Sequence, residues 1–153
     1  GMTATAKRDP SQIIKFRASG YDLLKTNDFV NRDANCTDLF SAGEIASTIG
    51  DMLKWDAALD SEKILKNSSK AQMWTSATLN SGRPIGYGFG WFLATVDGHK
   101  NIGHPGSTDG FAAANERFPD DELEIVVLCN SGGDGVAKDV AKQVAQYYFA
   151  RKK

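Results

Sequence analysis

Gly103-His104-Pro105-Gly106-Ser107-Thr108-Asp109-Gly110-Phe111 is the stretch on which the interpretation of this sequence depends. It contains one of only two histidines in the chain, three glycines and two adjacent hydroxyl residues. Glycine permits backbone angles and close approaches that a Cβ atom forbids, so the cluster predicts a tight backbone passage between two strands. A short polar segment precedes it at residues 98–101, and an alternating apolar run follows at residues 111–118.

Several other stretches flank this one in a defined order. They are Ala18-Ser19-Gly20-Tyr21, Ala42-Gly43-Glu44-Ile45-Ala46-Ser47-Thr48, Tyr87-Gly88-Phe89-Gly90-Trp91, Phe118-Pro119-Asp120-Asp121 and Ile125-Val126-Val127-Leu128-Cys129-Asn130. Their order and approximate spacing resemble those of the serine β-lactamase and penicillin-binding-protein-like hydrolases. The third active-site motif of that family is usually Lys-Thr-Gly and in some branches His-x-Gly, to which His104-Pro105-Gly106 is similar. The likeness runs from about Ile13 to the C-terminus.

The resemblance implies an α+β fold, namely the C-terminal portion of the β-lactamase/transpeptidase-like fold. Two helices precede an antiparallel sheet, and a C-terminal helix packs on that sheet. We expect residues 1–12 to form an N-terminal arm and residues 13–153 to form a single partial domain.

Two motifs of the family have no counterpart here. The family's nucleophile is the serine of Ser-x-x-Lys, and its second motif is Tyr-x-Asn or Ser-x-Asn. No serine or threonine of this chain has a lysine three residues later, and no tyrosine has an asparagine two residues later. The sequence therefore resembles the C-terminal part of a hydrolase that forms an acyl-enzyme with β-lactam, D-Ala peptide or ester substrates. By itself, the chain is expected to be inactive.

The resemblance also implies roles for the motif residues. His104 takes the place of the motif lysine, which orients a substrate carboxylate or assists proton transfer. Histidine at this position favours the peptidase and esterase branches. Ser107 would supply a backbone N–H to the oxyanion, and Thr108 and Asp109 would line the cleft. The alternative is that His104 only bonds a neighbouring backbone group and that Gly106 is only a turn residue.

Composition narrows the remaining function classes. The net charge of −1 gives no basis for binding nucleic acid, and no apolar run approaches the length of a membrane span. No secretory signal is visible, and the compartment stays open because many family members are secreted. Cys36 and Cys129 form no Cys-x-x-Cys pair, and no His-Glu-x-x-His motif occurs, so neither a metal nor a cofactor is expected.

Local patterns predict the individual elements. Thr48 followed by Asp51 predicts the start of a helix whose apolar residues, Ile49, Met52, Leu53 and Leu59, recur at helical spacing. Asn67 or Ser68 is expected to cap a second helix that runs through Met73 and Trp74, both core residues.

In the second half of the chain, a strand is expected from Gly86. Tyr87, Phe89, Trp91 and Leu93 share one face of it, while the intervening glycines allow another element to approach closely. Asp97-Gly98 predicts a hairpin, and residues 118–121 predict a turn between antiparallel strands. The final helix is expected to pack on the sheet through Val136, Val140, Val144, Tyr147 and Tyr148.

The apolar run 125–128 predicts a strand that is buried on both faces or central in its sheet. In the family, by resemblance, this strand pairs on its far side with a strand from the missing N-terminal part. Either residues 13–24 fold back over this edge, or two chains pair edge to edge, and we expect a homodimer or a swapped arrangement.

Two functional hypotheses remain. In the first, the chain is a hydrolase fragment whose Ser-x-x-Lys half comes from elsewhere. In the second, it is a non-catalytic binding or self-association module.

Overall fold

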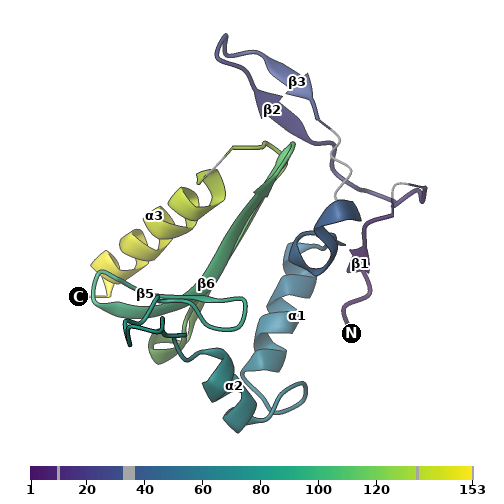
Figure 1. Ribbon diagram of the computed structural model, residues 1–153. Coiled ribbons are helices and arrows are strands. Elements are labelled where there is room, and N and C mark those ends of the chain that lie inside the picture. The colour runs from purple at the N-terminus through teal and green to yellow at the C-terminus, as the bar shows by residue number, and fades with distance from the viewer. Residues whose placement is uncertain (10, 33–36, 134, 153) are drawn as a thin grey trace.

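The computed structural model describes the chain except for residues 10, 33–36, 134 and 153. Its main feature is a four-stranded antiparallel sheet with helices on both faces (Figure 1). The elements in chain order are β1 (Ala6–Lys7), β2 (Tyr21–Leu23), β3 (Phe29–Asn31), η1 (Thr37–Ala42), β4 (Ile45–Ala46), α1 (Ile49–Leu59), α2 (Asn67–Met73), β5 (Phe92–Val96), β6 (His99–Thr108), β7 (Phe111–Phe118), η2 (Pro119–Asp121), β8 (Leu123–Cys129) and α3 (Val136–Arg151). The predicted α+β class and the order of helices and sheet are confirmed.

The large sheet is a meander with strand order β5-β6-β7-β8. Both predicted turns are present. Asp97 and Gly98 have φ of 51° and 89°, the positive values that a two-residue type I′ hairpin requires, and Val96 pairs with His99 across them. The turn of η2 joins β7 to β8. α3 covers one face of the sheet, mainly over β7 and β8, and α1 contacts β8 on the other face (Figure 1).

The segment before β5 differs from the prediction, because the strand begins at Phe92 and not at Gly86. Gly86 and Gly90 have φ of 69° and 78°, so the chain turns at both positions. Tyr87 then pairs antiparallel with Phe92. The expected close approach is real: a Cβ atom at Gly88 would lie 2.2 Å from the Met73 carbonyl oxygen.

Helix α1 begins as predicted, since the Thr48 side chain accepts a hydrogen bond from the Asp51 amide at 3.3 Å. Its buried face is less apolar than expected. Asp51 and Asp56 are buried together with Leu59, whereas Ile49 and Leu53 are 43% and 50% exposed. Arg117 and the backbone amide of Ala4, both outside the helix, bond these two carboxylates, and part of the apolar side of α1 faces outward.

The predicted cap of α2 is wrong. Its N-cap is Lys66, which makes no side-chain capping bond, and Asn67 is already helical. The Asn67 amide instead donates to the Glu62 carboxylate at 2.8 Å. The helix ends near the predicted Trp74, which is half-buried and packs edge-on against Trp91.

Helix α3 packs through a different face from the one predicted. Its buried residues are Ala137, Ala141, Ala145 and Phe149, which contact Ala112, Ala114, Phe118 and Ile125 of the sheet. The predicted contact residues, Val136, Val140, Val144, Tyr147 and Tyr148, are exposed. Alanines on both sides of the contact let the helix lie close to the sheet, so small side chains form the core and the larger ones remain outside.

Strand β8 is not central, as the apolar run had suggested, but lies at one edge of the sheet. Ile125 is buried, while Leu128 is 43% exposed. Residues 13–24 do not cover this edge: the Tyr21 amide bonds the Asn130 carbonyl at 3.0 Å, just past the end of β8.

The first third of the chain forms short strands and a 3-10 helix outside the large sheet. β1, within the expected arm, pairs with β4, and β2 pairs with β3 in a hairpin that projects from the rest (Figure 1). β3 and the first residues of η1 lie among residues 25–39, a stretch with no apolar periodicity. Cys36 lies outside the described residues. Of the helices described, none is long and apolar enough to cross a membrane.

Candidate functional site

The predicted motif lies within β6, which continues through His104 and Gly106 to Thr108. The predicted tight passage is confined to the turn after it, where Gly110 has φ of 77°. β5 pairs with β6 only as far as Gly103, so residues 104–108 have β7 on one side and, within the described chain, no strand on the other. Pro105 has no N–H and is tolerated because of this open side.

Backbone groups of a strand point alternately to its two sides. The turns at either end of β6 set this alternation, because His99 pairs with Val96 of β5 and Thr108 pairs with Phe111 of β7. The backbone N–H and C=O groups of even-numbered residues in β6 therefore bond to β7, and those of odd-numbered residues point to the β5 side. Ser107 lies beyond the end of β5, so its N–H and C=O groups face the open side.

The motif side chains do not share one face. Pro105 and Ser107 pair with Ala114 and Ala112, two residues of the core under α3, so they point to that face. His104, Gly106 and Thr108 point to the opposite face. The Ser107 hydroxyl is thus separated from the His104 ring by the strand, and only the backbone of Ser107 is available beside it.

His104 is exposed and held by two hydrogen bonds. Its Nδ1 lies 2.7 Å from the Pro105 carbonyl oxygen and its Nε2 lies 3.0 Å from the Tyr87 hydroxyl. A carbonyl oxygen only accepts, so in the neutral ring Nδ1 carries the proton and the tyrosine hydroxyl donates to Nε2. Phe92 packs against the same ring, with centroids 4.9 Å apart.

Tyr87 is the site residue that sequence reasoning missed. Its Tyr-Gly-Phe-Gly-Trp segment was interpreted as part of a strand, which would have directed the side chain to one sheet face. The positive φ of Gly86 and Gly90 makes a turn instead, and this turn brings the hydroxyl to His104. The alternating glycines of this segment were the only sequence feature that could have indicated the turn.

A hollow of about 430 Å³ lies at the turn end of β6. Ser107, Thr108 and Asp109 line it together with Asp22, Leu23, Leu24, Gly132 and Gly133. Asp22 fixes the turn by accepting a hydrogen bond from the Gly110 amide at 3.0 Å, and it also pairs with Arg32. The structure thus groups three of the five predicted site residues here, while His104 lies further along the strand.

At the other end of the motif, Gly103 makes room for the half-buried carboxyl group of Glu116. A Cβ atom there would overlap the Glu116 carboxylate. Burial raises the pKa of Glu116, while a hydrogen bond from Asn101 and the charges of Lys138 and His104 act in the opposite direction. Gly103 is thus required by packing.

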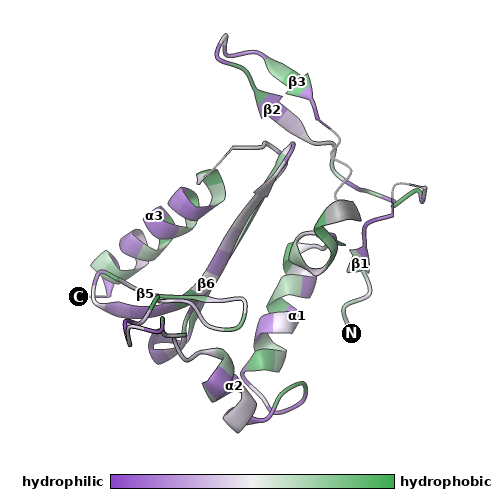
Figure 2. Cartoon of the chain, viewed as in Figure 1, coloured by the Kyte–Doolittle hydropathy of each residue, from purple (hydrophilic) through white to green (hydrophobic). Residues whose placement is uncertain are grey.

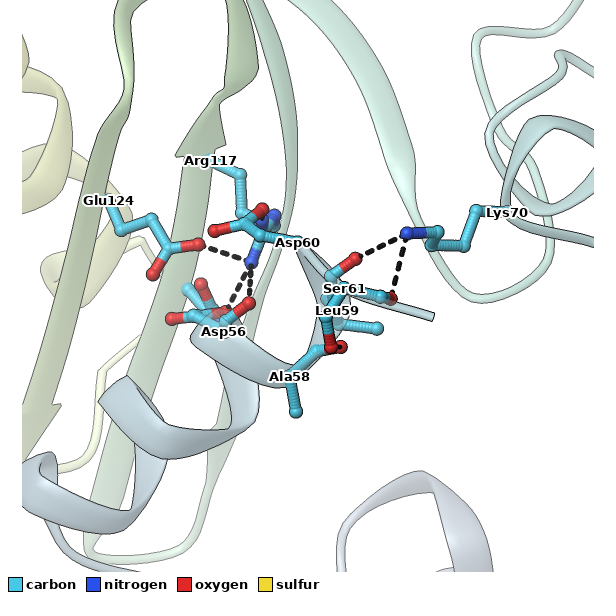
Figure 3. A network of polar contacts seen from close by, with 9 residues as sticks. Asp56, Ala58, Leu59, Asp60, Ser61, Lys70, Arg117 and Glu124 are labelled. Atoms are coloured by element: carbon cyan, nitrogen blue, oxygen red, sulfur yellow. Dashed lines mark hydrogen bonds and ion pairs between the residues drawn. The ribbon is translucent and has the colours of Figure 1, made fainter. Parts of the chain in front are cut away.

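A buried ion cluster supports the sheet on the His104 face (Figure 3). Arg117 is 3% exposed, bonds Asp56 at 2.9 Å, and also contacts Asp60 and Glu124. Asn115 donates to the same Asp56 carboxylate at 3.1 Å. The cluster joins the C-terminal turn of α1 to β7 and β8.

The cluster contains more carboxylates than cations, and the resulting negative charge affects the pKa of Glu124. Burial and the neighbouring Asp56 charge raise the pKa of Glu124 to about 7, against the opposing charge of Arg117. Beside the cluster, Lys70 is buried and donates to the carbonyl oxygens of Leu59 and Ser61 at 2.8 and 3.0 Å. It satisfies the carbonyl groups where α1 ends.

The described residues contain no group of three or more histidine, cysteine or acidic side chains that could hold a metal ion. The best-buried lysine, Lys70, bonds only carbonyl oxygens and no serine hydroxyl. Within the part of the chain that the structure describes, the candidate site therefore consists of the open edge of β6, the imidazole of His104 and the hollow at the turn end of β6.

Comparisons with known proteins agree on the relationship. Penicillin-binding protein 4* of Bacillus subtilis (strain 168) is 26% identical over 106 residues, which cover 69% of this chain and 24% of that protein. Among solved structures, a penicillin-binding protein from Bacillus halodurans matches with a TM-score of 0.70 and 18% identity over 97% of this chain and 45% of that chain. An octameric penicillin-binding protein homologue from Pyrococcus abyssi matches with a TM-score of 0.75 and 20% identity over 97% and 34%.

A D-stereospecific amidohydrolase from Streptomyces sp. shares the fold as well, with a TM-score of 0.67 and 20% identity over 86% of this chain and 40% of that chain. In every one of these comparisons, the chain spans less than half the length of its relative. The sequence model of the β-lactamase family matches residues 1–149. This chain therefore belongs to the β-lactamase family.

Proposed function

We propose that this chain forms one wall of the acyl-transfer site of a β-lactamase-like serine hydrolase, and that the Ser-x-x-Lys segment comes from outside these 153 residues. The observation that carries the proposal is the open edge of β6 at residues 104–108. An extended substrate can lie along such an edge and bond its backbone groups, as peptides do in strand addition. β-Lactams, D-Ala peptides and esters are the substrate classes.

Within this wall, the Ser107 N–H donates to the developing oxyanion, and His104 orients the substrate carboxylate or assists proton transfer. Gly106 leaves the His104 face of the strand open beside the edge, since nothing lies within 4 Å of the place a Cβ would occupy. Thr108 and Asp109 contact the part of the substrate that reaches the hollow. Without a nucleophile, binding can occur and acylation cannot.

The test is NMR titration of the 153-residue chain with a β-lactam, followed by mass spectrometry of the mixture. We expect shifts of the amide resonances of residues 104–108 and no covalent adduct. A Gly106→Val variant, whose side chain would crowd the His104 face beside this edge, should lose the shifts. Gly50→Ala, in the first turn of α1 where nothing lies within 4 Å of a Cβ atom, is the control and should keep them.

Two results contradict the proposal. A covalent β-lactam adduct would show that the chain has its own nucleophile. An absence of shifts at residues 104–108 would show that this edge does not bind the ligand.

The alternative function, a non-catalytic self-association module, is favoured by a different observation, the outer edge of β8 along which no strand of the described chain pairs. The octameric assembly belongs to the Pyrococcus abyssi homologue. For this chain, we propose a homo-oligomer formed through β8.

A further inference from the structure

The ion cluster between α1 and the sheet contains a buried oxygen atom that lacks a donor. Asp56 has no exposed surface, and its Oδ1 accepts hydrogen bonds from Arg117 at 2.9 Å and from Asn115 at 3.1 Å. The Oδ2 atom of Asp56 is also buried, and it has no hydrogen-bond partner in the described part of the chain. A buried acceptor without a donor is costly, so a donor is expected close to this atom.

Glu124 lies where it can supply this donor. It is directly opposite Arg117 in the pairing of β7 with β8, the Arg117 guanidinium contacts it, and a hydrogen bond joins its side chain to that of Asp56. Two ionised carboxylates cannot form a hydrogen bond, because neither carries a proton, so one of the two groups must be protonated. The Asp56 carboxylate already accepts from Arg117 and Asn115, so Glu124 is the group that carries the proton.

The charges around Glu124 agree with this assignment (Figure 3). Arg117 on β7 and both Asp56 and Asp60 at the end of α1 act on Glu124, so one guanidinium faces three carboxyl groups. Burial, the charge of Asp56 and the hydrogen bond to Asp56 raise the pKa of Glu124 from 4.5 to about 7, against the charge of Arg117. Lys70, the buried cation beside the cluster, is bonded to carbonyl oxygens. A proton on Glu124 thus relieves an excess of negative charge at this place.

The same cluster fastens the last turn of α1 to the sheet. The buried residues of α1 are Asp51, Asp56 and Leu59, and Asp51 lies at the opposite end, where it bonds the Ala4 amide. α1 accordingly carries hydrophilic residues among hydrophobic ones in Figure 2. Charged groups therefore make a large part of the contact between its last turn and the strands β7 and β8. Asp56 and Arg117 are buried by the described chain alone, so the contact is internal to it.

We propose that Glu124 and Asp56 share one proton, and that this proton acts as a switch on the last turn of α1. While the proton is bound, the Glu124 carboxyl donates its O–H to Asp56, and Arg117 balances the charge of the pair. As the pH rises, Glu124 releases the proton to water, the hydrogen bond is lost, and two ionised carboxylates face each other. The last turn of α1 then separates more readily from the sheet. The proposal does not depend on the proposed function.

The first experiment measures the titration of Glu124 from the chemical shift of its side-chain carboxyl carbon in the 153-residue chain. We expect a midpoint near pH 7, because burial and the Asp56 carboxylate hold the proton on Glu124. In Asp56→Asn, which removes the charge of the proton's acceptor, the midpoint should fall toward 4.5. A midpoint near 4.5 in the wild-type chain would overturn the proposal.

The second experiment follows the opening of α1 by hydrogen exchange at pH 6 and pH 8, expressed as protection factors that correct for the intrinsic exchange rate. If Glu124 has its ordinary pKa of 4.5 once the turn is open, the opening equilibrium rises about tenfold between these pH values. We therefore expect the amides of residues 58–60 to lose about tenfold in protection. Their exchange should depend little on low urea concentrations, because a local opening exposes little surface. A urea dependence as steep as that of β6 and β7 would show that only global unfolding frees the turn, and would overturn the proposal.

Two glutamine variants separate this proton from other effects of pH. In Glu124→Gln, the side-chain amide donates to Asp56 at every pH, so the protection of residues 58–60 should be the same at pH 6 and pH 8. Glu122→Gln, at an exposed residue just before β8, removes the same charge and should keep the loss of about tenfold. Both variants retain the two histidines of the chain. A loss in Glu124→Gln equal to that of the wild-type chain, or no loss in Glu122→Gln, would contradict the switch.

Discussion

Arg117 shows how much of this fold depends on single charged residues. Its guanidinium is almost fully buried and bonds Asp56, which has no exposed surface at all. Removing one partner of a buried pair leaves the other charge without compensation. We expect Arg117→Ala to lower the free energy of unfolding by about 3–5 kcal/mol, as measured by urea denaturation. The exposed Arg83→Ala should change it by less than about 0.5 kcal/mol, and a similar loss in both variants would contradict the role of the cluster.

Glu124 gives the same cluster a dependence on pH. Its pKa is raised from 4.5 to about 7, so the folded state binds more protons than the unfolded state between these values. Stability from this group is therefore fully present below pH 4.5 and declines as the pH rises to about 7. We expect Glu124→Gln to flatten the decline, so that its gain over wild type is larger at pH 8 than at pH 5. Denaturation at both pH values measures this, and equal effects would refute it.

Tyr87 is expected to fix the state of the His104 ring. In Tyr87→Phe, Nε2 loses its donor while the bond from Nδ1 to Pro105 remains. We expect the nitrogen chemical shift of Nε2 to change, with little change at Nδ1 and little change in stability, because the site is exposed. Tyr147→Phe is the matched control and should leave both nitrogen signals unchanged.

At this scale, the sequence predicted residues with a distinctive chemistry and missed those defined by their partners. His104, Gly106 and Ser107 lie on one strand and not in the expected passage between two strands, and their roles stay predictions. Arg117 bonds Asp56, which is 61 residues earlier in the chain, and no local pattern relates the two. Such pairs become visible only once the sheet has brought distant segments together.

At the scale of elements, two glycines make a matched test. A Cβ atom at Gly88 would lie 2.2 Å from the Met73 carbonyl oxygen, whereas Gly50, in the first turn of α1, has nothing within 4 Å. We expect Gly88→Ala to destabilise the protein, because backbone must move. Gly50→Ala should stabilise it by up to about 1 kcal/mol, because alanine favours the helix. Thermal unfolding of the two variants should shift in opposite directions, and shifts in the same direction would contradict this contrast.

Most elements were predictable from local patterns, and their environments were not. The Thr48 cap, the Asp97-Gly98 hairpin and the turn of η2 follow from neighbouring residues alone. The buried face of α3 could not be derived in this way, because the valines suggested a core that the alanines in fact provide. The edge position of β8 likewise depends on which strands are present to pair with it.

At the scale of the whole molecule, two of the open strand edges in the described part of the chain have different properties. The β6 edge is short and carries Pro105, Gly106 and Ser107, which suits a small ligand. The β8 edge runs along Leu123–Cys129, and residues 125–129 on it carry no charge. The two edges therefore separate the proposed chemistry from the proposed self-association.

The meander order of the large sheet has a consequence for folding. Each of its strands pairs with its neighbours in sequence, and α3 follows directly, so residues 92–151 can assemble by closing only short loops. Short loops cost little entropy and speed folding. The contact between Arg117 and Asp56 spans a much longer loop and would form later. In native-state hydrogen exchange, β6 and β7 should be the slowest to open, and α1 should open earlier.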